Sequence, residues 1–170
     1  MRVAAIALLA AVASATAAAA APIRPQRTVP CAESIDTTPF PYIGNSQPQQ
    51  RYRAVLDAVS VPPAYLQQVI ATRQQPWRYW HKAGLVVRAG HHAVTITVPS
   101  RWRTGAAIVW GNSGGPYESL RIAGCNGNPH TGNAYAGGFY LRSGAACVPL
   151  TFTVGDRSAV VRFGIGTHCR

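Results

Sequence analysis

The segment at residues 148–165, VPLTFTVGDRSAVVRFGI, decides the fold class. Two runs rich in β-branched and aromatic residues, Val148–Val154 and Ala159–Ile165, flank the polar connection Gly155-Asp156-Arg157-Ser158. Runs of this kind on either side of turn-forming residues are typical of a β-hairpin. The segment therefore predicts two antiparallel strands joined by a short turn.

The same pattern recurs along the chain and predicts a mostly-β fold. A second hairpin connection is expected over Arg88–His92, and the only helical pattern lies between Pro62 and Pro76, where apolar residues recur at i, i+4. The longest Gly- and Asn-rich loop covers residues 124–138. We expect a single antiparallel β-sandwich, immunoglobulin-like or jelly-roll-like, with at most one short helix. The further predicted strands are Tyr52–Ser60, Leu85–Arg88, Ala93–Val98, Ala106–Trp110, Glu118–Ala123 and Phe139–Arg142.

The N-terminal residues have the layout of a secretory signal peptide. Arg2 precedes an apolar run over Val3–Val12, and small residues then offer cleavage after Ala17 or Ala20. A membrane anchor is the alternative, but a spanning helix needs roughly 20 apolar residues and the Ala-rich second half is weak. We expect a signal peptide at 1–20, a Pro- and Gln-rich extended arm at 21–50 and the β-sandwich domain at 51–170, with no transmembrane segment in the mature chain.

Four cysteines in an exported chain predict two disulfides. Their spacing matches no C-x-x-C metal motif, so we expect no metal site and no cofactor. Three connectivities are possible. We favour Cys125–Cys147, which would close a local loop, with Cys31–Cys169, which would attach the N-terminal segment to the last strand.

The charge balance is strongly basic. Lys and Arg number 16 against 5 Asp and Glu, for a formal net charge of +11, or +10 once Arg2 leaves with the signal peptide. Such a balance favours an anionic cell-wall polymer or envelope surface as partner. The alternative is that an Arg-rich, Lys-poor composition reflects a GC-rich genome. No nucleic-acid-binding signature occurs, and export argues against nucleic acid as the natural partner.

Residues 111–116, GNSGGP, look like the nucleophile loop of chymotrypsin-like serine proteases. That family needs a His, then an Asp, then the Ser along the chain, but no acid lies between His81 and Ser113. Turn chemistry between two strands explains the same residues. A hydrolase using Ser113 with His91 or His92 is the minor alternative, and we predict that the protein is not an enzyme.

Residues 77–82, WRYWHK, combine aromatic and basic residues, and residues 101–103, RWR, repeat this combination. Trp and Tyr faces flanked by cations can stack on rings while the charges meet anions, although the same aromatics also suit a β core. The predicted function is a secreted non-enzymatic module that associates with an anionic extracytoplasmic or cell-envelope component. A structural or partner-binding protein without a polymer ligand is a third possibility. The candidate binding residues are Trp77, Arg78, Lys82, Arg101, Trp102 and Arg103.

The last third of the chain resembles a group of small secreted actinobacterial proteins without an assigned activity. The resemblance implies export and a frame of paired cysteines, and it transfers no functional residues. The residues that carry it are Trp110-Gly111, Glu118–Cys125, Gly137–Arg142, Cys147–Leu150, Val160–Gly166 and Cys169.

Overall fold

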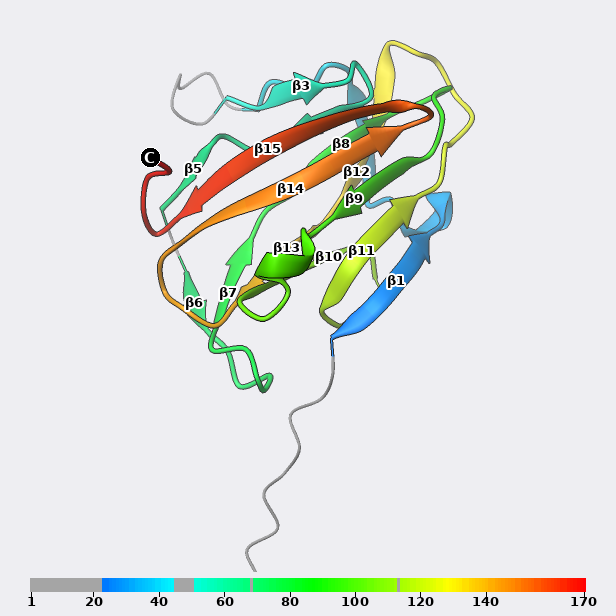
Figure 1. Cartoon of the computed structure of the whole chain (residues 1–170). Coiled ribbons are helices and arrows are strands. Elements are labelled where there is room, and N and C mark those ends of the chain that lie inside the picture. The colour runs from blue at the N-terminus through cyan, green and yellow to red at the C-terminus, as the bar shows by residue number, and fades with distance from the viewer. Residues whose placement is uncertain (1–22, 45–50, 68, 113) are drawn as a thin grey trace, which may run out of the picture.

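The computed structural model describes residues 23–44, 51–67, 69–112 and 114–170, and these form two β-sheets with only short 3-10 helical turns (Figure 1). The prediction of a mostly-β, sandwich-like fold is confirmed. Sheet A contains β1 (Arg24–Val29), β5 (Tyr65–Leu66), β6 (Ile70–Ala71), β7 (Tyr79–Lys82), β9 (Val94–Thr97), β10 (Ala106–Trp110), β11 (Tyr117–Ile122), β13 (Gly137–Leu141), β14 (Ala146–Val154) and β15 (Arg157–Ile165). Sheet B contains β2 (Asp36–Pro39), β3 (Arg53–Val55), β4 (Val59–Val61), β8 (Leu85–Arg88) and β12 (Thr131–Tyr135). The helical turns are η1 (Cys31–Glu33) and η3 (Ser100–Trp102).

Sheet A curls into a half-barrel around the core. Its strand order is β5-β15-β14-β9-β11-β10-β13-β7-β6, with β1 paired to β11, and sheet B has the order β2-β12-β8-β4-β3. β14 shows the period-2 alternation that builds the core, because Val148, Leu150, Phe152 and Val154 are all buried in it. Two pairs are parallel, β1 with β11 and β5 with β15, and the other strand pairs of the described residues are antiparallel.

The hairpin predicted for residues 148–165 is confirmed. β14 and β15 pair along their whole length, from Ala146 opposite Ile165 to Val154 opposite Arg157. Gly155 has a φ of 58° in the turn, a conformation that glycine adopts without a steric penalty.

Three sequence predictions of local structure are wrong. The stretch between Pro62 and Pro76 forms the short edge strands β5 and β6 rather than a helix. Leu66 is buried whereas Ile70 is 62% exposed, so the i, i+4 pair does not present one apolar face to the core. The expected strand Tyr52–Ser60 is divided into β3 and β4 by a turn at Leu56-Asp57, whose φ angles are both 54°.

The predicted hairpin over Arg88–His92 is also wrong, because β8 belongs to sheet B and β9 to sheet A, so the segment connects the two sheets. The loop at 124–138 contains β12. The expected N-terminal arm contributes a strand to each sheet, since β1 pairs with β11 and β2 with β12. Residues 1–22 and 45–50, which include the expected signal peptide, lie outside the described residues.

The disulfides join Cys31 to Cys125 and Cys147 to Cys169, so the predicted pairing of Cys125–Cys147 and Cys31–Cys169 is wrong. The parallel pairing of β1 with β11 explains the first bond. Val29 lies opposite Ile122, and the residues that follow the two strands therefore remain neighbours, with 5.7 Å between the Cα atoms of Cys31 and Cys125. The chain turns back after β15 and brings Cys169 beside Cys147 on β14, with 5.2 Å between their Cα atoms.

The two disulfides indicate an oxidising environment outside the cytoplasm. In the part of the chain that the structure describes, no helix is long and apolar enough to cross a membrane.

Candidate functional site

β7 directs its side chains alternately to the core and to the surface. His81 lies opposite the core residue Phe139 and is itself buried, which lowers the pKa of its imidazole. Trp80 and Lys82 point to the other face of the sheet, where Trp80 is half-buried and Lys82 is exposed. The same alternation continues back to Arg78, which is exposed and whose backbone N–H donates to the carbonyl of Leu141 over 3.0 Å.

β13 supplies the facing residues. Tyr140 lies opposite Trp80, with 4.6 Å between the ring centroids and 47° between the ring planes. The register places Arg142 opposite Arg78, just past the end of β13. We call these five residues, Arg78, Trp80, Lys82, Tyr140 and Arg142, the β7–β13 strip. It consists of two aromatic rings with a cation at one end and two cations at the other.

The strip borders a corner at which the chain passes between the two sheets. β7 leads into β8 through Ala83-Gly84, and β12 leads into β13 through Ala136. The corner is held by hydrogen bonds to its carbonyl groups: Trp110 donates from its indole N–H to Ala83 over 2.8 Å, and the Tyr52 hydroxyl donates to Gly84 over 3.2 Å. Because these donors are fixed by packing, the position of the adjacent Lys82 backbone is fixed as well.

Three hollows meet at Lys82. Their volumes are about 400, 410 and 260 Å³, within or near the range of ligand sites. The first is lined by Trp80, Lys82, Val109, Gly111, Asn112, Gly114, Ala136, Gly137 and Tyr140. The other two share Tyr42, Tyr52, Lys82 and Gly84. Tyr42 and Tyr52 form a second aromatic pair there, edge to face, with centroids 4.9 Å apart.

The wall opposite Trp80 in the first hollow is anchored by an ion pair. Glu33 accepts from the backbone N–H of Asn112 over 2.8 Å and from the guanidinium of Arg27 over 2.5 and 3.0 Å. The hydrogen bond with Arg27 is the main cause that lowers the pKa of Glu33, so its carboxylate stays ionised at neutral pH.

Burial raises the pKa of Tyr52 and Tyr140, which keeps both phenols protonated and able to donate.

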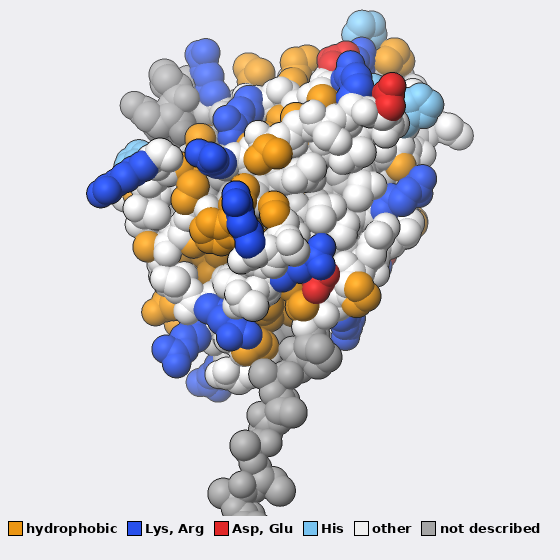
Figure 2. All heavy atoms as spheres, viewed as in Figure 1, with side chains coloured by type: hydrophobic (Ala, Val, Ile, Leu, Met, Phe, Trp, Pro, Cys, Tyr) orange, Lys and Arg blue, Asp and Glu red, His pale blue; other side chains and the backbone are white. Residues whose placement is uncertain are grey.

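In the described part of the chain the cations of the strip form no ion pair, although Asp36 lines one of the hollows at Lys82. All five acidic residues belong to the described part of the chain, and three of them pair with cations outside the strip: Arg27–Glu33, Arg88–Asp57 and Arg103–Glu118. Among the described residues, no carboxylate pairs with a cation of the strip. On the face seen in Figure 2, Lys and Arg side chains are widely spread, including the lower left near β6 and β7, while Asp and Glu appear at few places.

The six residues predicted from the sequence lie in two places. Arg78 and Lys82 belong to the strip, and Trp77 is buried beside it, with the guanidinium carbon of Arg142 5.8 Å from its ring centroid. Arg101, Trp102 and Arg103 lie in and after η3, where Trp102 packs against the core and Arg103 pairs with Glu118 over 2.7 Å. The backbone N–H of Arg142 donates to Gly105, so η3 approaches the strip without joining it.

Sequence reasoning missed Tyr140 and Arg142 as partners of this surface. The usable signal was the alternation of Arg78, Trp80 and Lys82, and of Tyr140 and Arg142, which puts each set on one face of a strand.

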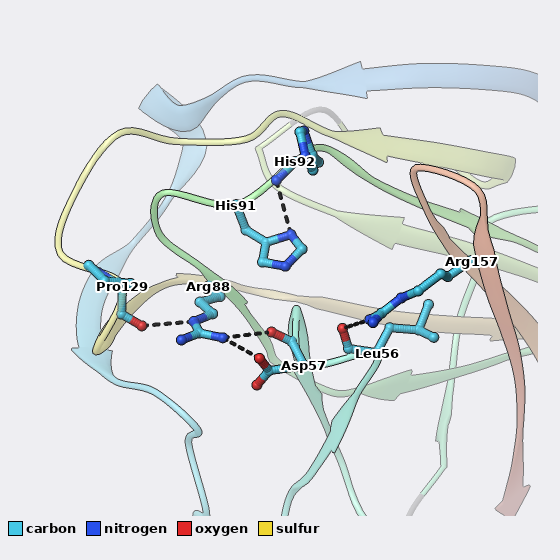
Figure 3. A network of polar contacts seen from close by, with 7 residues as sticks. All are labelled: Leu56, Asp57, Arg88, His91, His92, Pro129 and Arg157. Carbon is cyan, nitrogen blue, oxygen red and sulfur yellow. Dashed lines mark hydrogen bonds and ion pairs between the residues drawn. The ribbon is translucent and has the colours of Figure 1, made fainter.

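Of the residues in the hydrolase alternative, the structure describes His91 and His92, and neither of them lines the three hollows at Lys82. Ser113 lies outside the described residues. His91 and His92 follow β8 beside the network that Arg88 makes with Asp57 and with the Pro129 carbonyl (Figure 3). The His92 backbone N–H donates to Nδ1 of His91 over 2.9 Å. Among the described residues, no group of three or more His, Cys, Asp or Glu could hold a metal ion.

Comparisons of the chain with protein-family models, with curated proteins and with solved structures found no match. The assignment of function therefore depends on the geometry of the site.

Proposed function

We propose that the protein is a secreted, non-enzymatic module that binds an anionic component of the cell envelope or of another extracytoplasmic surface through the β7–β13 strip. The observation that carries the proposal is that three cations without an ion-pair partner among the described residues, Arg78, Lys82 and Arg142, flank the aromatic pair of the strip. Cations that form no ion pair within the protein are available to the anionic groups of a ligand.

Secretion is supported by the signal-peptide pattern at 1–20 and by the two disulfides. The resemblance of the last third of the chain to small secreted actinobacterial proteins agrees with this location.

The test compares two variants of equal net charge in a sedimentation assay with isolated bacterial cell envelopes over a salt series. The strip variant carries Arg78→Gln, Lys82→Gln and Arg142→Gln. The control carries Arg121→Gln, Arg162→Gln and Arg170→Gln, which remove three exposed cations from β11, β15 and the C-terminus. Neither β11 nor β15 is hydrogen-bonded to β7 or β13.

We expect envelope binding that weakens as salt rises, that the control variant retains and that the strip variant loses. Equal binding by the two variants would show that net charge alone acts. Absence of binding by the natural protein would point instead to a structural or partner-binding role, and either result would overturn the proposal.

A further inference from the structure

We infer that the ligand of the β7–β13 strip is an acidic polysaccharide, a chain of sugar rings that carry carboxylate groups. This inference rests on the proposed function and specifies its ligand class. The starting observation is that the cations of the strip are separated by aromatic rings and not clustered. Arg78, directly before β7, and Lys82, at its end, are four residues apart, which corresponds to about 13 Å of extended chain, and Trp80 lies between them.

A ligand that satisfies this arrangement needs anionic groups at intervals and apolar ring faces between them. Trp80 and Tyr140 are both half-buried, so each presents part of its ring to solvent beside the charges. A simple phosphate polymer would pair with the three cations but would leave these ring surfaces in water. Covering exposed aromatic area is favourable, which makes a ring-bearing polyanion the better fit.

The angle between the rings distinguishes a sugar from a nucleobase. Trp80 and Tyr140 are inclined by 47°, so a flat base could lie parallel to only one of them. A puckered sugar ring presents C–H groups in several directions and can touch both. The oxidising location indicated by the disulfides also favours an extracellular polysaccharide over nucleic acid.

The hollow beside the strip provides polar groups for sugar hydroxyls. Asn112 and the Tyr140 phenol line it together with Lys82, and the bond from the Asn112 backbone to Glu33 fixes that wall. A few placed polar groups in an otherwise apolar hollow are the usual means of orienting a small ligand.

Lys82 also connects the strip to a second aromatic pair. Tyr42 and Tyr52 line the two hollows on the other side of Lys82, and the Tyr52 ring is fixed by its bond to the Gly84 carbonyl. Ring positions on both sides of one cation suit a chain of several sugars. The affinity should therefore rise with chain length.

The experiment measures binding of oligogalacturonates of one to six residues to the full protein by calorimetry. Linear polyphosphate, a neutral glucose oligomer and single-stranded DNA are the comparison ligands. The variants are Trp80→Leu, which removes the ring but keeps an apolar side chain, Lys82→Gln, and the control Tyr65→Leu, which changes a half-buried aromatic residue of β5 outside the strip. Circular dichroism verifies that each variant is folded.

We expect affinity for oligogalacturonate to increase with length and to exceed that for the neutral oligomer. Trp80→Leu should weaken it about tenfold, equivalent to about 1.4 kcal/mol, while Tyr65→Leu leaves it unchanged. Binding of polyphosphate should respond to Lys82→Gln but not to Trp80→Leu.

Strip-dependent binding of polyphosphate without binding of oligogalacturonate would overturn the polysaccharide assignment and leave the proposed function standing. Tighter binding of DNA than of oligogalacturonate would also overturn the assignment. If no anionic ligand binds through the strip, the inference and the proposed function both fail.

Discussion

The disulfide arrangement predicts unequal contributions of the two bonds to stability. Each bond closes its own loop, since Cys31 and Cys125 are separated by 94 residues, Cys147 and Cys169 by 22, and the loops do not overlap. On the chain-entropy model the larger loop contributes about 4.7 kcal/mol and the smaller about 3.4 kcal/mol to the free energy of unfolding. A small domain is stable by only about 5–15 kcal/mol in total. Replacement of Cys31 and Cys125 by Ala should therefore be the more damaging change.

The assay has two stages. Trypsin places the four cysteines in separate peptides, residues 28–51, 122–142, 143–157 and 163–170. Mass spectrometry without reduction should find 28–51 joined to 122–142 and 143–157 joined to 163–170. Urea unfolding of the two double variants should then show the larger loss for Cys31→Ala/Cys125→Ala. Any species that joins 28–51 to 163–170 would refute the topological reasoning, and equal losses in urea would refute the loop-size argument.

Two further predictions concern the corner and the ion pair beside it. Gly138→Ala should lower the melting temperature by about 2–12 °C, because a Cβ there would overlap the His81 carbonyl, whereas Gly105→Ala, with space for a Cβ, should have little effect in the same thermal scan. Glu33→Gln should lower stability at pH 7. Arg27 holds the pKa of Glu33 below its usual 4.5, so the carboxylate contributes fully above that pH and loses its contribution as the pH falls through the lower folded-state value. The difference between the natural protein and this variant should accordingly shrink in acid melts, and a difference independent of pH would contradict the assignment.

Local patterns predicted seven of the fifteen described strands, β8–β11 and β13–β15, because period-2 alternation reports directly on burial. β10, β14 and β15 were expected within two residues of their observed ends, and each is a run of β-branched, aromatic or small apolar residues. The failures fall where non-local pairing decides. The short strands β5 and β6 exist because β15 and β7 offer them hydrogen-bonding edges. No pattern between Pro62 and Pro76 indicates that β15 and β7 will be the pairing partners.

The disulfide error has the same origin. Spacing alone made a bond between Cys125 and Cys147 plausible, but the bond to Cys31 follows from the parallel pairing of β1 with β11, a contact between segments about 90 residues apart in sequence. Parallel partners far apart along the chain leave no signature in either strand. Both cysteines also lie where the chain crosses from sheet A to sheet B, after β1 and after β11, so the bond ties the two crossings together.

The candidate site shows what composition can and cannot predict about charge. A net charge of +11 predicts attraction to anions anywhere on the surface, and it could equally reflect genomic composition. The structure separates the cations by what they touch: Arg27, Arg88 and Arg103 are bound to three of the five carboxylates, and each ion pair ties together segments of the fold. In the part of the chain that the structure describes, the three cations of the β7–β13 strip pair with none of the acids and flank the aromatic pair of Trp80 and Tyr140. Arg121 and Arg162 also lack an ion pair among the described residues, so the absence of a carboxylate partner does not by itself distinguish the strip from a surface that is basic through genomic bias. The distinguishing feature is the aromatic pair between the cations, and the charge-matched variants described above measure whether that arrangement matters.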